Sequence, residues 1–242
     1  MIARRRFLAL ALAGASICAL PACDAGPTIE FNYRLTVDVE TPDGVRSGYS
    51  VIKYWGQQRS SNKLDPYAGG LGAHARGEAV AVDLPGGRTL FALLQTETDV
   101  DAATAYPGLA FADEIRDEAD ITKRLQLLQS LKGQTRPLPR TEMTLANGGT
   151  EVSAYPMLVT FKDIKDPTSV ARVDPDDLPA SFGAGYRLKS ISVTITDEPM
   201  TIGIEKRLRW LTDKNRKRFG PNDKPEGIPL GDFKRLFSTE VK

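Results

Sequence analysis

The sequence has few of the residues that build metal centres and nucleophilic active sites. Among 242 residues it has two cysteines, Cys18 and Cys23, and one histidine, His74. A zinc site needs several cysteine or histidine ligands, and a Ser-His-Asp triad would have to use His74, which lies in a polar, Gly-rich stretch. The sequence has neither a Gly-x-Ser-x-Gly motif nor a phosphate-binding loop. We therefore predict no metal, no cofactor and no catalytic residue.

The chain also lacks an excess of charge of one sign. It has 32 basic and 31 acidic residues. Three of the basic residues are arginines close to the N-terminus, in a segment that we expect to be removed. Without them, 29 basic residues stand against 31 acidic ones, a net charge of −2. Proteins that bind nucleic acids usually show a basic excess, and we expect no nucleic-acid partner.

The apolar run near the N-terminus is too short for a typical membrane-spanning helix. It covers residues 7–22, which is 16 residues, whereas a spanning helix needs roughly 20. Three arginines precede the run and it contains no acidic residue, which is the layout of a secretory signal. We predict a signal peptide over residues 1–22 and an exported mature chain; an uncleaved N-terminal anchor is the alternative.

The end of this segment, Leu20-Pro21-Ala22-Cys23, resembles the lipobox of bacterial lipoproteins, although Pro21 departs from the usual small residue. The resemblance implies that the thiol of Cys23 receives a diacylglyceryl group and that its amine is then acylated. Removing the signal also leaves Cys23 as the only cysteine, which fits lipidation better than a disulfide. We expect residues 23–28 to form a lipid-anchored linker on the periplasmic side, with Asp24 favouring the inner membrane.

The start of the signal resembles a twin-arginine export signal. The residues that carry this resemblance are Arg4, Arg5, Phe7 and Leu8. Ala3 and Ala9 stand where a hydroxyl residue and a lysine would be typical, and the general secretory route therefore stays open.

Strand patterns dominate the mature chain. Residues 29–40 alternate between apolar and polar side chains, the pattern of a half-buried strand. The turn at 41–44 joins them to a second strand at 45–55, and a second hairpin covers 78–95. Further strands are predicted at 141–145, 150–154, 157–162, 169–173 and 186–196. Short strands with Gly/Pro turns predict a mainly β domain over residues 29–200, an antiparallel β-sandwich or barrel with one or two helical insertions.

Two segments of this domain have a different character. Asp113 and the acidic residues after it begin a pattern of helical spacing that ends near Gly133, and we predict a helix over 113–132. Residues 56–75 are polar and Gly-rich, and we predict a loop there.

The C-terminal part, residues 201–242, is rich in basic residues. A helical pattern runs from Ile202 to Arg218, and the tail after it looks loosely ordered apart from Phe233, Leu236 and Phe237. A basic helix that carries an aromatic residue can lie on an anionic membrane surface. The residues predicted to make that contact are Lys206, Arg207, Arg209 and Trp210. The alternative is a solvated helix that packs through its apolar residues.

Three segments of the chain resemble uncharacterised bacterial exported proteins. They are residues 33–37, 76–84 and 173–178. The resemblance spans most of the mature chain and implies no activity.

These observations favour a non-enzymatic lipoprotein of the cell envelope that binds a protein partner or has a structural role. A periplasmic hydrolase or a small-ligand-binding protein is the alternative, with a site formed by acidic residues that are distant in sequence. Asp174, Asp176 and Asp177 are the candidates for the hydrolase. These three, and also Asp163 and Asp166, form oxygen-rich clusters of a kind that can hold Ca²⁺, although Asp-Pro pairs also form turns.

Overall fold

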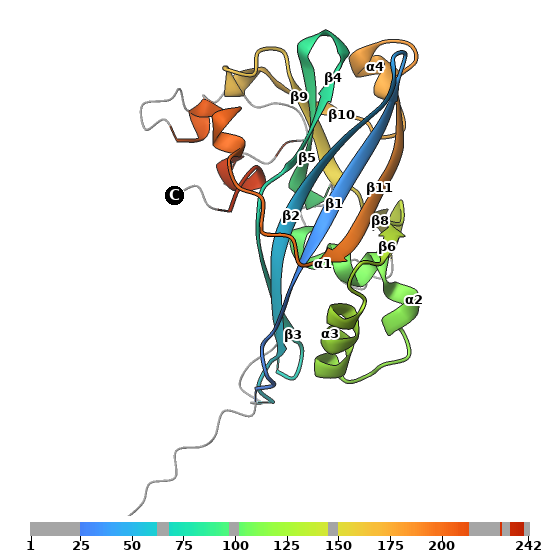
Figure 1. Cartoon of the computed structure of the whole chain (residues 1–242), viewed down its shortest axis with the longest axis vertical. Coiled ribbons are helices and arrows are strands. Elements are labelled where there is room, and N and C mark those ends of the chain that lie inside the picture. The colour runs from blue at the N-terminus through green and yellow to red at the C-terminus, as the bar shows by residue number, and fades with distance from the viewer. Residues whose placement is uncertain are drawn as a thin grey trace, which may run out of the picture.

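The computed structural model describes residues 25–61, 68–96, 102–144, 150–212, 228 and 233–239 (Figure 1). The predicted signal peptide, its export residues (Arg4, Arg5, Phe7 and Leu8) and the lipidation site Cys23 lie outside these residues. No helix within the described part is both long and apolar enough to cross a membrane.

The larger of the two main antiparallel sheets in the described part has five strands in the order β3-β2-β1-β11-β6. The strands are β1 (Ile29–Thr41), β2 (Gly44–Gln58), β3 (Leu71–Arg76), β6 (Thr135–Pro137) and β11 (Arg187–Thr196). The pairing of Thr41 with Gly44 confirms the predicted hairpin turn. The prediction of a loop over 56–75 is partly wrong, because β2 continues to Gln58 and β3 begins at Leu71. His74 therefore lies in a strand.

The smaller sheet has four strands in the order β10-β9-β5-β4. They are β4 (Val80–Leu84), β5 (Arg88–Thr96), β9 (Pro156–Phe161) and β10 (Val170–Val173), and the single-turn 3-10 helices η1 (Pro85–Gly87) and η3 (Pro167–Ser169) lie in its connections. A separate pair, β7 (Thr141–Thr144) and β8 (Thr150–Ser153), completes the strands. The described part is thus mainly β with helical insertions, as the sequence predicts.

Within the ranges that the structure describes, four short α-helices interrupt the strands: α1 (Ala102–Ala110), α2 (Ala112–Ile115), α3 (Ile121–Ser130) and α4 (Leu178–Phe182). The prediction of one continuous helix over 113–132 is wrong, because α2 ends at Ile115 and Asp120 starts a new helix. The Asp120 side chain accepts a hydrogen bond from the Lys123 amide (3.0 Å), which is the bonding of a helix N-cap. Sequence patterning missed α1 entirely.

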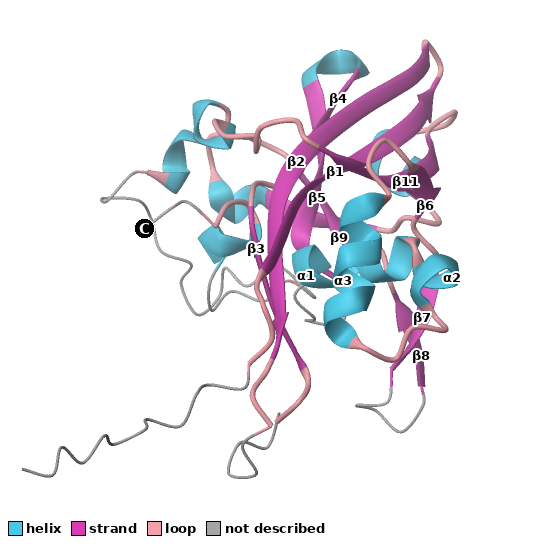
Figure 2. Ribbon diagram, turned by 60° about the horizontal axis from the view of Figure 1, so that its bottom comes forward, coloured by secondary structure: helices cyan, strands magenta, loops and turns pink. Residues whose placement is uncertain are grey.

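The main hydrophobic core lies between the two sheets and is also covered by α1 and α3 (Figure 2). The apolar face predicted for the first strand provides much of it, since Tyr33, Leu35, Val37 and Val39 are at most 1 % exposed. The Tyr33 hydroxyl donates to the Ala103 carbonyl (2.7 Å), which ties this strand to α1 and satisfies a buried polar group.

A second core lies on the opposite face of the smaller sheet. In β5, Leu90, Ala92 and Leu94 belong to the main core, whereas Phe91 and Leu93 belong to the second. A strand buried on both faces reads as a continuous apolar run, and residues 90–94 show such a run. The C-terminal part of the chain covers this second core.

The chain reaches the second core by crossing the outer face of the larger sheet at residues 197–203 (Figure 1). The Asn32 side chain donates to the Glu198 carbonyl (2.8 Å), and Arg34 forms an ion pair with the Glu198 carboxylate. At the far side, Thr201 and Val51 exchange two hydrogen bonds of 2.9 Å. These contacts fix the position of the chain just before it enters the segment next to the second core.

The predicted helix over 202–218 is not present in the described residues. Two single-turn 3-10 helices, η4 (Ile204–Lys206) and η5 (Arg209–Leu211), take its place up to Thr212, and residues 213–218 lie outside the described part. The last described residues form η6 (Phe233–Leu236). Phe233, Leu236 and Phe237 are buried, and so is Ile228, which the sequence analysis did not single out.

Candidate anion-binding pocket

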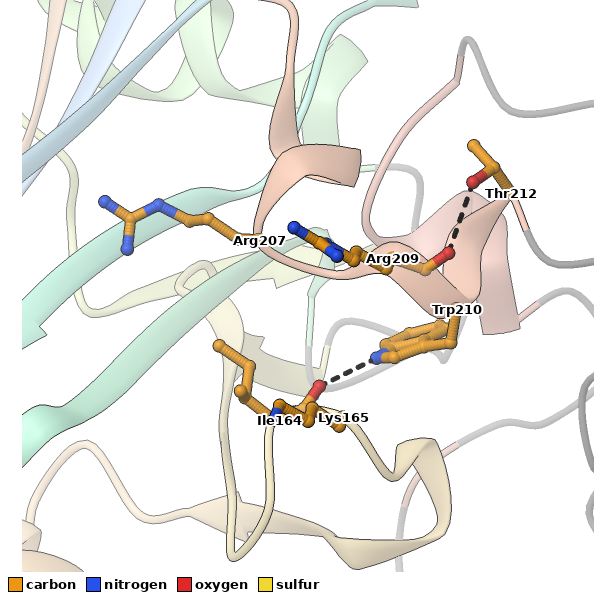
Figure 3. Close-up of a pocket in the computed structure, with 6 residues that line it drawn as sticks. All are labelled: Ile164, Lys165, Arg207, Arg209, Trp210 and Thr212. Atoms are coloured by element: carbon orange, nitrogen blue, oxygen red, sulfur yellow. Dashed lines mark hydrogen bonds between the residues drawn. The ribbon is translucent and has the colours of Figure 1, made fainter.

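A cavity of about 730 Å³ opens beside η5, between the η4–η5 segment and the turn that follows β9 (Figure 3). Its described lining is Ile164, Lys165, Arg207, Arg209, Trp210 and Thr212. Three of these six residues carry a positive charge and none is acidic. Figure 3 shows the two arginines on one wall and Ile164 and Lys165 on the other, with the Trp210 indole between them.

The η4–η5 wall is held by apolar side chains on one side and by a buried carboxylate on the other. Ile204, Leu208 and Leu211 are at most 5 % exposed and pack in the second core. Glu78 is 3 % exposed, and its carboxylate accepts hydrogen bonds from the amides of Gly203 (2.8 Å) and Ile204 (2.9 Å). These anchors leave the charged residues between them, including Arg207 and Arg209, on the outside.

Trp210 joins the two walls of the pocket. Its indole N–H donates to the Ile164 carbonyl (3.1 Å), and its ring stacks on Phe233 at 5.5 Å between centroids. The side chain is only 5 % exposed, so the part of the ring that lines the cavity is held rigidly by the core behind it.

The opposite wall is a turn that its own side chains stabilise. The Asp163 side chain accepts a hydrogen bond from the Lys165 amide (2.9 Å), and the Ser169 hydroxyl donates to the Asp163 carbonyl (2.8 Å). Asp166 caps η3 by accepting from the Thr168 amide (2.9 Å). These are the roles that favour aspartate and serine in turns, and they place Lys165 opposite Arg209.

The three cations of the pocket differ in how they are paired. Arg207 forms a bidentate pair with Asp83, at 2.5 and 2.7 Å. Hydrogen bonding from this arginine lowers the pKa of the Asp83 carboxyl, and the same bond raises the pKa of Arg207. Arg209 and Lys165 are exposed, and within the described residues neither side chain has a hydrogen-bond or ion-pair partner. Two cations are therefore available to a ligand.

Two smaller cavities adjoin this pocket. One of about 220 Å³ shares Arg207 with it and is also lined by Tyr49 and Ile202, which are 57 % and 68 % exposed. Another of about 290 Å³ shares Ile164 and extends towards Lys162. The shared residues make the three cavities neighbours, so the site has room for a ligand larger than a simple ion.

The four residues predicted for membrane contact have different places in this structure. Arg207, Arg209 and Trp210 line the pocket, whereas Lys206 is exposed outside its lining. The Trp210 ring is buried in the second core, and contact of these four residues with a membrane stays a prediction. Sequence reasoning missed Lys165, since only the fold brings its turn opposite η5.

The acidic residues of the alternative hypothesis have local structural partners. Asp174 accepts a hydrogen bond from the Asp176 amide (2.8 Å), and Asp177 caps α4 through the Ala180 amide (3.2 Å). Asp176 forms an ion pair with Arg140, and this bond lowers the pKa of its carboxyl. No cluster of three or more His, Cys, Asp or Glu side chains suited to a metal occurs within the described ranges.

His74 also has a local partner. Its ring stacks on Trp55 of the neighbouring strand, with the centroids 5.5 Å apart. The pair lies in β2 and β3, and neither residue lines the pocket beside η5.

Comparison of this chain with protein-family models, with curated proteins and with solved structures returned no match. The pocket must therefore be interpreted from its own chemistry.

Proposed function

We propose that this chain is an exported lipoprotein of the bacterial cell envelope that binds a partner without chemical conversion, through anionic groups held in the pocket beside η5. The observation that carries the binding role is a pair of cations, Arg209 and Lys165, which face one cavity from two walls and have no side-chain partner among the described residues. The export and lipidation rest on the signal and lipobox of residues 1–23.

The chemistry of the pocket favours carboxylate, sulfate or phosphate groups. Arginine binds such groups in a bidentate manner, and lysine adds a point charge. Trp210 and Ile164 add apolar surface against which the carbon skeleton of a ligand can pack. The adjoining cavities, with exposed Tyr49 on one side and Lys162 on the other, suit an acidic segment of an envelope protein or polymer.

Export and lipidation are tested first by the intact mass of the protein purified from membranes. A mature chain that begins at Cys23 and carries the mass of acyl chains is the expected result. A chain that is cleaved but carries no lipid would contradict the proposed lipid anchor, and the proposed binding role of the pocket would still stand. An unprocessed chain would show that residues 7–22 stay as an N-terminal anchor.

The pocket is tested by titration with pyrophosphate and with a short polyglutamate peptide. The chain has two tryptophans, Trp55 and Trp210, so in a Trp55→Phe background the emission reports on the pocket alone. We expect binding that weakens as salt is added. Because a hydrogen bond to a charged group contributes about 1.5–3 kcal/mol, Arg209→Ala or Lys165→Ala should weaken binding about tenfold or more.

Two further variants make this test specific. Asp83→Asn releases Arg207 from its pair and should strengthen binding, because a third cation becomes available. Arg46→Ala removes an exposed arginine of β2 that does not line the pocket, and should leave the affinity unchanged. Equal losses for Arg46→Ala and Arg209→Ala would show attraction to general surface charge and would contradict a built site.

A further inference from the structure

We infer that the β2–β3 end of the larger sheet rests on the lipid headgroups of the membrane that anchors the chain, and that the pocket beside η5 faces away from that membrane. The inference rests on the proposed lipidation of Cys23. It adds an interaction surface, and it excludes the headgroups of the anchoring bilayer as the ligand of the pocket.

The first step of the argument is the length of the tether. The Gly26 amide donates to the Gln58 carbonyl (3.0 Å), and the Thr28 hydroxyl donates to the Gln57 side chain (3.0 Å). The Gly26 backbone is also packed closely, since a β-carbon there would lie 2.8 Å from Thr122 Oγ1. The chain is therefore fixed to the sheet from Gly26 onward.

Only three residue steps separate Gly26 from Cys23. Even fully extended, they span at most about 11 Å. Acyl chains on Cys23 must lie in the hydrocarbon layer, which is covered by a headgroup layer roughly 5–8 Å thick. Most of the tether is used within that layer, so the end of the sheet that holds Gly26 lies at the headgroup surface.

The residues at this end suit such a surface. Leu71, at the start of β3, is 45 % exposed. The stacked pair Trp55 and His74 lies three residues further along the β2–β3 pairing. Tryptophan with a polar neighbour favours the boundary between headgroups and hydrocarbon.

The pocket lies towards the other end of the molecule. Tyr49 of β2 lines the small cavity that shares Arg207 with the pocket, and nine residue steps along the strand separate Tyr49 from Gln58. At about 3.3 Å per residue this is about 30 Å. Figure 1 shows η4 and η5, in orange, well away from β3 and the start of β1. A molecule whose β2–β3 end rests on the membrane therefore presents the pocket to the periplasm.

The test uses the acylated full chain in vesicles of phosphatidylethanolamine and phosphatidylglycerol that contain a nitroxide-labelled lipid. Lipidation consumes the thiol of Cys23, so an introduced cysteine is the only free thiol for a fluorophore. The variants are Leu71→Cys and Ala68→Cys at the proposed contact, Arg209→Cys at the pocket, and Asp43→Cys in the distant β1–β2 turn. All four positions are exposed.

We expect loss of fluorescence at positions 71 and 68 and none at 209 or 43. A flexible insertion of ten Gly and Ser residues between Asp24 and Ala25 should abolish the loss at 71, because it removes the limit on reach. Quenching at 209 without quenching at 71 would overturn the inference, and so would acylated protein with no quenching at any site. An intact mass without acyl chains would overturn the proposed anchor itself, and this orientation with it.

Discussion

Tyr54 carries an ionisable hydroxyl into the main core. Its side chain is 2 % exposed and its ring stacks on Phe31 at 4.8 Å. Burial raises the pKa of this phenol from 10.0 to about 12, because a phenolate would lose its hydration there. The unfolded chain therefore loses this proton at lower pH than the folded protein does.

This shift predicts a loss of stability in alkali. The contribution of Tyr54 is complete below pH 10, and the free energy of unfolding should fall by about 2–3 kcal/mol as pH rises towards 12. Urea denaturation at pH 9 and at pH 11.5 measures the change. In Tyr54→Phe the fall should be smaller by that amount, because the variant keeps the ring without the proton. Equal pH dependence in both proteins would show that the pKa of Tyr54 is the same in the folded and the unfolded state.

At the scale of single residues, the sequence predicts only part of the candidate pocket. Sequence patterning selects Arg207, Arg209 and Trp210 because they are close together in a basic stretch. It cannot select Lys165, whose turn meets η5 only through the bond from the Trp210 indole to the Ile164 carbonyl. It also cannot predict that Asp83, over a hundred residues earlier, forms a hydrogen-bonded ion pair with Arg207. Long-range pairs of this kind leave no local periodicity.

At the scale of elements, strands were predicted well where one face is buried or where turn residues bound them. The alternation of residues 29–40 identifies β1, and the apolar run of 90–94 reflects the two cores on either side of β5. The edge strand β3 was missed because its pairing with β2 is made by backbone groups, which need no apolar pattern. The sequence predicts a helix over 202–218, where Ile204, Leu208 and Leu211 have helical spacing. Tertiary packing overrides that preference in the described part of this segment, up to Thr212.

The crossing of β2 over β4 depends on the absence of a side chain at Gly48. A β-carbon at this position would lie 2.2 Å from the Ala81 carbonyl oxygen, which is a backbone atom and cannot rotate away. We predict that Gly48→Ala lowers the free energy of unfolding by about 1–3 kcal/mol, because the two strands must separate. Chemical denaturation monitored by circular dichroism measures this loss.

Gly108 provides the matched control for that substitution. It lies inside α1, and a β-carbon there would have no neighbour within 4 Å. Gly108→Ala should therefore be neutral or should stabilise the protein by up to about 1 kcal/mol, since alanine favours helices. If both variants lost stability equally, the close approach of β2 and β4 would not be the cause.

At the scale of the whole molecule, the C-terminal segment completes the fold. Ala79 donates to the Phe237 carbonyl (2.8 Å), and the Thr239 amide donates to the Gly77 carbonyl (3.1 Å). This pairing sets the end of the chain beside the start of β4. Phe237 then contacts Phe91, Phe161, Trp210 and Phe233 at centroid distances of 5.3 to 5.8 Å. The second core, and the Trp210 wall of the pocket with it, depends on residues close to the C-terminus.

Phe237→Ala tests whether this segment is part of the folded unit. The side chain is fully buried, and removing it should lower the free energy of unfolding by about 3–5 kcal/mol through lost burial and the cavity left behind. Because Trp210 packs on Phe237, its emission should shift to longer wavelength in a Trp55→Phe background. Ile202→Ala is the control, since that side chain is 68 % exposed and its loss should change stability by less than about 0.5 kcal/mol. If the C-terminal segment were loosely held, both variants would lose equally little free energy of unfolding. The pocket would then lack the rigid wall that binding an anion between Arg209 and Lys165 requires.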